Sequence, residues 1–230
     1  MTAQLPSRPA AAPSWVKMAF ALFVGALVPT YWRDYGPANF LWFCDMGLLM
    51  TLIGLCLDST LLISTEAVAL AGPQTFWIAD FLTGGRIIGV SAYMFNPAIP
   101  LFTRLLSTFH LWLPILLIVL VYRMGYDRRA FWLQSFIAVG VLVASYLLTD
   151  PRHRPDAYPA AAVNVNRVWG IHQTDVQTWM PSLAFLGLHV LFWPLFFYLP
   201  THLIFRKIFR QPKRRVTSTS IDVEETEWAT

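Results

Sequence analysis

The chain has 230 residues, of which 56% are hydrophobic and only 13% are charged. Soluble domains average about 45–50% apolar and about 25% charged residues, so this composition excludes an ordinary soluble protein and indicates a membrane protein. The formal net charge is +4, but the basic residues stand at the ends of apolar runs. That placement is typical of the positive-inside bias of membrane proteins and argues against a nucleic-acid-binding surface.

The amino-terminal part of the chain predicts a disordered segment over 1–14 and a first helix over about 15–30. An apolar run, 18–28, follows Lys17 there. It has two interpretations: an uncleaved membrane helix or the apolar region of a signal peptide. The first is favoured because no small-x-small cleavage site follows before Tyr31.

Five further apolar stretches predict membrane helices, because about 20 apolar residues span the roughly 30 Å hydrocarbon core of a bilayer. They cover residues 38–57, 61–82, 101–124, 130–148 and 180–205. The predicted fold is therefore all-α, a polytopic bundle of about six transmembrane helices in one membrane domain, 15–205.

The segments between these helices are predicted from their polarity and length. Residues 87–95 are too short to span a bilayer and are expected to form a loop or a partly embedded hairpin. Residues 149–179 form the longest polar stretch, and residues 206–230 are first basic and then acidic, which indicates a disordered tail. Aromatic residues that flank the apolar runs, among them Trp77, Tyr93 and Tyr198, are expected to anchor helix ends at the bilayer interface.

The positions of the basic residues predict how the chain is oriented in the membrane. Arg206 and Lys207 begin a basic segment after the last helix, and Arg128 and Arg129 stand in the turn before residue 130. The positive-inside bias then places both termini in the cytoplasm, in the cell (inner) membrane, and the 149–179 loop outside. The basic tail has a second interpretation, binding to anionic lipid.

Ionisable residues inside the apolar runs mark a candidate site, because a charged group in a bilayer is costly and is commonly functional. Asp45, Asp80, His110 and His189 all fall in the predicted outer half of the membrane, at 1.5 Å per helical residue. Each has a structural alternative: an interhelical hydrogen bond for His110, a structural ion or hydrogen-bond partner for Asp45, solvation for Asp80 and a buried neutral ring for His189.

The two cysteines, Cys44 and Cys56, stand twelve positions apart in one predicted helix, which separates them by about 18 Å and excludes a disulfide between them. Cys44 is either a small core residue or a nucleophile. His110, His189 and Asp45 could supply three ligands to a metal ion, but the sequence has no close-spaced ligand pair, so neither a metal nor a cofactor is predicted.

The 149–179 loop contains Asn164, Asn166 and Trp169 within six residues. Such a segment is expected either to fold over the bundle as a lid, with Asn166 and Trp169 contacting substrate, or to form an ordinary surface loop with interfacial anchors.

Three features together resemble known families: Tyr35-Gly36 before an apolar helix with an early polar site, one His in the middle of the fourth helix, and an Asn-rich loop before the last helix. The layout over roughly 35–205 is similar to the androgen-induced-gene family of six-helix fatty-acid-ester hydrolases. It is also similar to the YwaF-like bacterial family with its vertebrate acyltransferase relatives. The resemblance implies a catalytic role for His110. The hydrolases' catalytic Thr would fall within 41–45, where this chain has no Thr or Ser, and the acyltransferase branch implies Cys44 instead.

Two classes of function therefore remain open. The first is a lipid-active enzyme that cleaves or transfers an acyl group, with His110 as general base and Cys44, or a water activated by Asp45, as nucleophile. The second is a non-enzymatic membrane protein, either a binding or transport protein with Asp45, Asp80 and His110 as its site, or a structural subunit of a complex. Membrane lipid is the expected partner in the first class; a membrane-protein partner or a homo-oligomer is left open.

Overall fold

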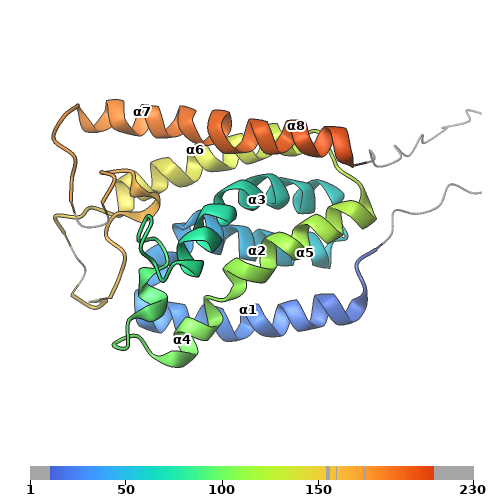
Figure 1. The fold of residues 1–230 in the computed structure, drawn as a ribbon, viewed down its shortest axis with the longest axis horizontal. Coiled ribbons are helices and arrows are strands. Elements are labelled where there is room, and N and C mark those ends of the chain that lie inside the picture. Colours follow the sequence, from blue (N-terminus) through green and yellow to red (C-terminus); the bar gives the residue numbers. More distant parts are fainter. Residues whose placement is uncertain (1–10, 154–155, 159, 173–174, 210–230) are drawn as a thin grey trace, which may run out of the picture.

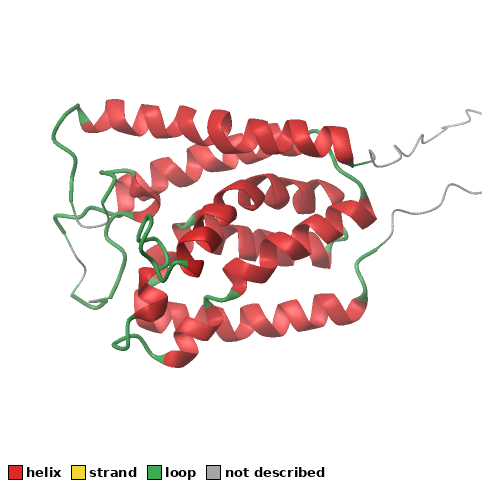
Figure 2. Cartoon of the chain, in the orientation of Figure 1, coloured by secondary structure: helices red, strands yellow, loops and turns green. Residues whose placement is uncertain are grey.

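The computed structural model describes residues 11–153, 156–158, 160–172 and 175–209. Within these ranges the regular structure is helical and no strand occurs, and Asp150 and His153 form only an isolated bridge (Figure 2). The all-α prediction is thus confirmed. The predicted tails 1–14 and 206–230 lie largely outside the described residues.

Short turns join most of the helices, and two longer segments, 83–100 and 149–181, separate α3 from α4 and α6 from α7. In chain order they are α1 (Ser14–Tyr35), the 3₁₀ helix η1 (Pro37–Leu41), α2 (Phe43–Cys56), α3 (Thr60–Leu82), the 3₁₀ helix η2 (Ala92–Phe95), α4 (Leu101–Leu106), α5 (Phe109–Met124), α6 (Ala130–Leu148), the 3₁₀ helix η3 (Val165–Arg167), α7 (Ser182–Phe192), the π-helix η4 (Trp193–Tyr198) and α8 (Leu199–Ile208).

The helices form an elongated bundle (Figure 1). Helix α1 runs along one edge, α7, η4 and α8 run along the opposite edge, and α3 packs between them against α2, α5 and α6. The start of α1 and the end of α8 lie at the same end of the bundle, which we call the terminal end. The opposite end, which we call the loop end, holds residues 83–100 and the described part of 149–181.

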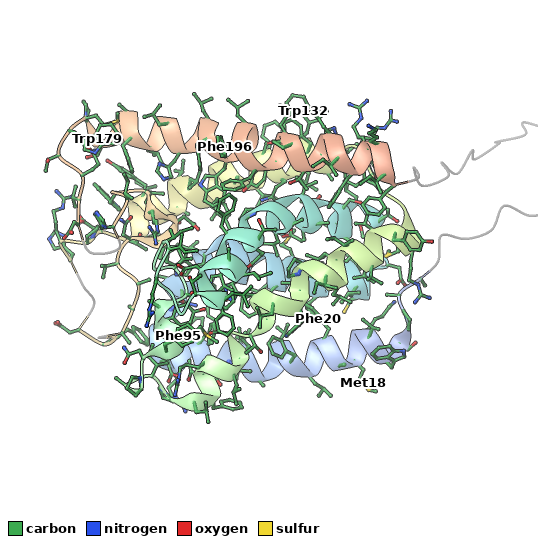
Figure 3. The ribbon with its side chains drawn as sticks, in the orientation of Figure 1. Met18, Phe20, Phe95, Trp132, Trp179 and Phe196 are labelled. Carbon is green, nitrogen blue, oxygen red and sulfur yellow. The ribbon has the colours of Figure 1, made fainter. Side chains whose placement is uncertain are left out.

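Large apolar side chains cover the outside of the bundle. Figure 3 shows Met18 pointing away from the bundle, whereas Phe20 on the same helix points inward, where it packs edge-on against Trp112. Many more apolar side chains are exposed on α5, α6, α7 and α8, while Ser64, Thr65 and Glu66 are buried inside. An apolar exterior around a partly polar interior is compatible with a membrane protein.

Four helical segments are long and apolar enough to cross a membrane: Ser14–Tyr35, Leu101–Met124, Ala130–Leu148 and Ser182–Ile208. Helix α2 has 14 residues, which gives a length of about 21 Å, shorter than a hydrocarbon core. Helix α3 has 23 residues but carries several buried polar groups and is not one of the four. Six spans therefore remain a prediction.

The expectation of one continuous helix over 38–57 is wrong. Trp42 is extended, with ψ of 135°, and separates η1 from α2. Pro37 begins η1. The Leu41 carbonyl oxygen accepts a hydrogen bond from the side chain of Asn166, so a side chain of the distant loop replaces a helical backbone donor there. The helix expected over 101–124 is likewise divided between α4 and α5, and the last helix continues to Ile208 rather than ending at residue 205.

Local sequence accounts for the two ends of α3. The Ser59 hydroxyl accepts a hydrogen bond from the Leu62 N–H and caps the start of α3. Gly84 and Gly85, which follow α3, both adopt positive φ, a conformation that glycine reaches without strain. Residues 87–95 form a loop with the short helix η2, which is the first of the two forms predicted for them.

Candidate functional site

A cavity of about 400 Å³ opens at the loop end of the bundle. This volume lies within the range of small-molecule sites. Its walls come from α1, η1, α2, α3, the 83–100 loop, the α4–α5 junction and the 160–167 segment. The lining includes the aromatic residues Tyr31, Tyr35, Trp42, Trp77 and Tyr93 and the polar residues Asn39, Cys44, Asp45, Ser107, His110, Asn164 and Arg167. The fold thus brings three of the candidate residues, Cys44, Asp45 and His110, to one cavity.

His110 stands in the first turn of α5 and is buried, with its ring stacked on that of Trp77 at 4.5 Å between centroids. Its Nδ1 lies 2.7 Å from the carbonyl oxygen of Ser107. Because a carbonyl oxygen only accepts hydrogen bonds, Nδ1 must carry a proton, and a neutral ring then has Nε2 as its basic nitrogen. The backbone therefore fixes the tautomer that a general base facing the cavity requires.

Asp45 stands in the first turn of α2, where the helix dipole favours a negative charge. Its Oδ2 accepts a hydrogen bond of 3.0 Å from Asn39 Nδ2, whereas its buried Oδ1 has no partner among the described residues. The extended residue Trp42 allows the hydrogen bond between Asn39 and Asp45, because it lets η1 pack against the start of α2. A buried unpartnered carboxylate oxygen at a cavity is ready to accept a hydrogen bond from a ligand.

Cys44 precedes Asp45 on α2, is partly buried and is a free thiol, as is Cys56. This confirms the absence of a disulfide between the two. Of the pair, only Cys44 lines the cavity, whereas Cys56 ends α2 near the terminal end and is exposed.

Several aromatic residues of the cavity were not predicted as site residues. Trp77 is buried, and its Nε1–H lies near the Tyr93 hydroxyl but outside hydrogen-bonding geometry. Tyr31 of α1 shares a short hydrogen bond with the hydroxyl of Ser107, which closes the floor of the cavity between α1 and α4. Trp77 and Tyr93 stand at the ends of apolar runs, a position that also suits interfacial anchors, so no sequence signal separates the two roles.

Asp80 does not line the cavity. Its Oδ1 accepts hydrogen bonds from the backbone N–H groups of Ile87, Ile88 and Gly89, and its Oδ2 accepts two from Ser91. Both oxygens are used to shape the 83–91 loop, and through this loop Asp80 positions Val90 and Tyr93 at the cavity wall. Its solvation, the structural alternative, does not occur either, because the residue is fully buried.

Asn166 does not line the cavity, but it hydrogen-bonds the backbone of residues next to the cavity wall. Its Nδ2 donates to the carbonyl of Leu41 at 2.7 Å and to the Ser145 hydroxyl at 3.1 Å, and its Oδ1 accepts from the N–H of Phe43 at 3.2 Å. It thereby caps α2 and ties the loop to the helix that carries Cys44 and Asp45. Both Asn166 and its neighbour Arg167 adopt positive φ, an uncommon conformation for residues other than glycine.

Trp169 holds the same loop against α6. Its ring stacks on Tyr146 at 4.2 Å, and its indole N–H donates to the carbonyl of Thr149. The Arg152 guanidinium lies 5.0 Å from the centroid of the Trp169 ring. It also donates hydrogen bonds to the Asp150 carboxylate, and these bonds lower the pKa of that carboxyl from its usual value. Asn164 and Arg167 of the loop line the cavity, whereas Asn166 and Trp169 do not.

His189 lies on α7 apart from the cavity lining, half-buried, with Nδ1 3.3 Å from the carbonyl of Phe185. His189 stands in the part of the last helix nearest the loop end, but an equal depth along different helices does not bring side chains to one site. Within the described ranges, no group of three or more His, Cys, Asp or Glu side chains is arranged to hold a metal ion.

Comparison of the chain with protein-family models, with curated proteins and with solved structures yields no match.

Proposed function

We propose that the chain crosses the membrane six times, with both termini in the cytoplasm and the cavity toward the outer face. The proposal is supported by the four segments that are long and apolar enough to span, and by the position of α2 and α3 among them. It is also supported by the basic residues near the terminal end, which include Lys17, Arg128 and Arg129.

We further propose that the cavity is the active site of a lipid acyl hydrolase or acyltransferase. The observation that carries this proposal is the presence, on one aromatic cavity, of a free thiol and a histidine whose tautomer is fixed with Nε2 as base. A nucleophile, a base and an apolar binding space are the parts that acyl transfer requires.

In the proposed reaction His110 Nε2 takes the proton of the Cys44 thiol, and the thiolate attacks the carbonyl carbon of a lipid ester. The C–O bond of the ester breaks, and the alcohol leaves with the proton from His110. Water or an acceptor alcohol then gives its proton to His110 and attacks the thioester, which releases the fatty acid or a new ester and returns the proton to the thiol. The unpartnered Trp77 Nε1–H is a candidate donor to the oxyanion that forms at each attack.

The test uses the purified protein in detergent with a p-nitrophenyl ester of a long-chain fatty acid. We expect nitrophenolate release and an acyl adduct on Cys44, detected by peptide mass spectrometry. Cys44→Ala should abolish the adduct, and His110→Ala should slow its formation about 10²–10⁴-fold, the usual contribution of a general base. Cys56→Ala is the matched control, because it removes the other free thiol of the same helix outside the cavity.

The outcomes separate the alternatives. Turnover that survives Cys44→Ala but is lost in Asp45→Asn would transfer the role of nucleophile to a water held by Asp45. An intact, folded wild-type protein with neither adduct nor turnover contradicts acyl chemistry. The unpartnered Asp45 oxygen would then favour the second candidate function, a binding or transport protein whose ligand donates a hydrogen bond to that carboxylate.

A further inference from the structure

A second group of buried polar side chains lies outside the cavity, in the half of the bundle toward the terminal end. It consists of Glu66 of α3, Gln134 of α6 and Tyr198 of η4, which we call the inner oxygen cluster. Glu66 and Gln134 are each 2% exposed, and Tyr198 is fully buried. At 1.5 Å per residue, Glu66 stands about 9 Å from the start of α3 and Gln134 about 6 Å from the start of α6.

Each member of this cluster has an oxygen without a hydrogen-bond partner: Glu66 Oε1, Gln134 Oε1 and the hydroxyl of Tyr198. The three residues come from elements that pack against one another, since α3 contacts both α6 and η4, and α6 contacts η4 (Figure 1). The Tyr198 hydroxyl lies near Gln134, outside hydrogen-bonding geometry, and within electrostatic reach of the Glu66 carboxyl. Three unpartnered oxygens therefore occupy one region of the interior.

The local backbone adds further oxygens to this region. Proline has no N–H, so Pro73 leaves the carbonyl of Ala69, one turn from Glu66, without its usual helical donor. Pro194 near the start of η4 and Pro200 in the first turn of α8 lack N–H groups, so helical donors are missing on both sides of this π-helical segment. Interrupted helices of this kind supply carbonyl ligands to ions in membrane proteins, and π-helical turns are frequent at functional sites.

The contacts around Glu66 explain why no protein group satisfies it. No Lys, Arg or His forms an ion pair with Glu66 among the described residues. A Cβ added to Gly47 would lie 2.9 Å from Glu66 Oε2 and 2.8 Å from Leu70, so α2 approaches this carboxylate closely with a glycine. The site is thus enclosed by backbone and apolar side chains, and it holds one acidic group.

We propose that the inner oxygen cluster binds one dehydrated monovalent cation, with Na⁺ as the ion of matching chemistry, through Glu66, Gln134 and Tyr198. Carboxylate, amide and hydroxyl oxygens are the ligands of hard cations. A single carboxylate balances a single positive charge, whereas a divalent ion would leave a net charge in a low-dielectric interior. The proposal is independent of the acyl chemistry, because none of the three residues lines the cavity.

The test measures thermal unfolding of the full chain in detergent, in NaCl and in N-methyl-D-glucamine chloride at equal ionic strength. We expect Na⁺ to raise the unfolding midpoint in a saturable manner. Glu66→Gln should abolish this response, and Tyr198→Phe, which removes only the hydroxyl, should shift the half-saturating Na⁺ concentration upward about tenfold. Gln74→Leu is the matched control, because Gln74 is also buried on α3 with an unpartnered Oε1 but is not part of the cluster.

A midpoint that is the same in both salts for the wild-type protein overturns the proposal, and it would indicate a protonated Glu66 or a buried water in place of a cation. A Na⁺ response that persists in both Glu66→Gln and Tyr198→Phe overturns it as well, because the ion would then bind elsewhere. If Glu66→Gln does not fold, the shift in Tyr198→Phe alone decides, with an unshifted response counting against the site.

Discussion

Asn166 shows how a single side chain can set the position of a site that it does not line. Its three hydrogen bonds join the 160–170 loop to the end of η1, the start of α2 and the last turn of α6 at Ser145. Its backbone is left-handed, with φ of 53°. The side chain and the backbone therefore make separate contributions, and these can be separated by substitution.

We expect Asn166→Ala to lower the free energy of unfolding by about 2 kcal/mol, since it leaves the Phe43 N–H and the Leu41 carbonyl without their buried partner. Asn166→Gly loses the same bonds but tolerates the positive φ, so it should be about 1 kcal/mol more stable than Asn166→Ala. Thermal unfolding in detergent measures this order. Equal stability of wild type and Asn166→Ala would show that these bonds do not hold the loop.

The polar residues of the cavity could be singled out from the sequence, and the aromatic ones could not. Asp45 and His110 stand out in the sequence because a buried ionisable group is costly in a membrane helix, whatever the fold around it. Trp77 and Tyr93, at the ends of apolar runs, could either anchor a helix end at the bilayer interface or line a cavity, and only tertiary contacts distinguish the two roles. Asp80 and His189 stand out in the sequence in the same way but do not line the cavity, because depth along a helix does not specify the face on which a side chain points.

At the scale of the elements, the 83–100 loop is built around the end of α3. The Asp80 carboxylate accepts hydrogen bonds from the backbone N–H groups of residues 87–89 and from the N–H and hydroxyl of Ser91. Arg104 of α4 donates to the carbonyl oxygens of Met94 and Ile99. Polar side chains of the neighbouring helices thus satisfy the backbone of a segment that has little regular structure of its own.

We expect Asp80→Asn to loosen this loop without unfolding the bundle. An amide presents only one acceptor oxygen, and its NH₂ group would face N–H donors that the carboxylate now satisfies. Amide hydrogen exchange of residues 87–91 should become at least about tenfold faster, while exchange in α5 and α6 should be unchanged. The matched control is Asp150→Asn, which removes a partly exposed carboxylate at the same end of the bundle that bonds mainly to Arg152. Unchanged exchange in Asp80→Asn would contradict the role assigned to Asp80.

Helix existence was easier to predict than helix continuity. The 130–148 helix matches α6 at both ends, because its apolar run is bounded by Arg128 and Arg129 before it and by Asp150 and Pro151 after it. The 38–57 run looks equally apolar, yet it divides at Trp42, because Asn166 from more than a hundred residues away takes the Leu41 carbonyl. Such long-range contacts leave no periodic signal in the segment that they interrupt.

At the scale of the whole molecule, the number of membrane crossings depends on α2 and α3. The turn between them, at Asp58 and Ser59, lies at the terminal end, where Lys17 of α1 pairs with Asp58 at 2.6 Å. If both helices cross the bilayer, as proposed, this turn must face the same compartment as the α5–α6 turn at Arg128. If they only enter it from the loop end, the turn is buried in the membrane.

Single cysteines placed in a background without Cys44 and Cys56 decide between these arrangements. We expect Ser59→Cys and Arg128→Cys to react with a membrane-impermeant maleimide only after the cytoplasmic face is opened, whereas Arg86→Cys and Thr178→Cys should react in intact cells. The reason is geometric, because the α2–α3 and α5–α6 turns, which carry the first pair, lie at the terminal end, and the 83–100 and 149–181 segments, which carry the second pair, lie at the loop end. Reaction of Ser59→Cys from neither side, with Arg128→Cys behaving as expected, would reduce the six crossings to the four that length and hydropathy already support. The cavity would then be reached from the same face as before, because its walls all belong to the loop end.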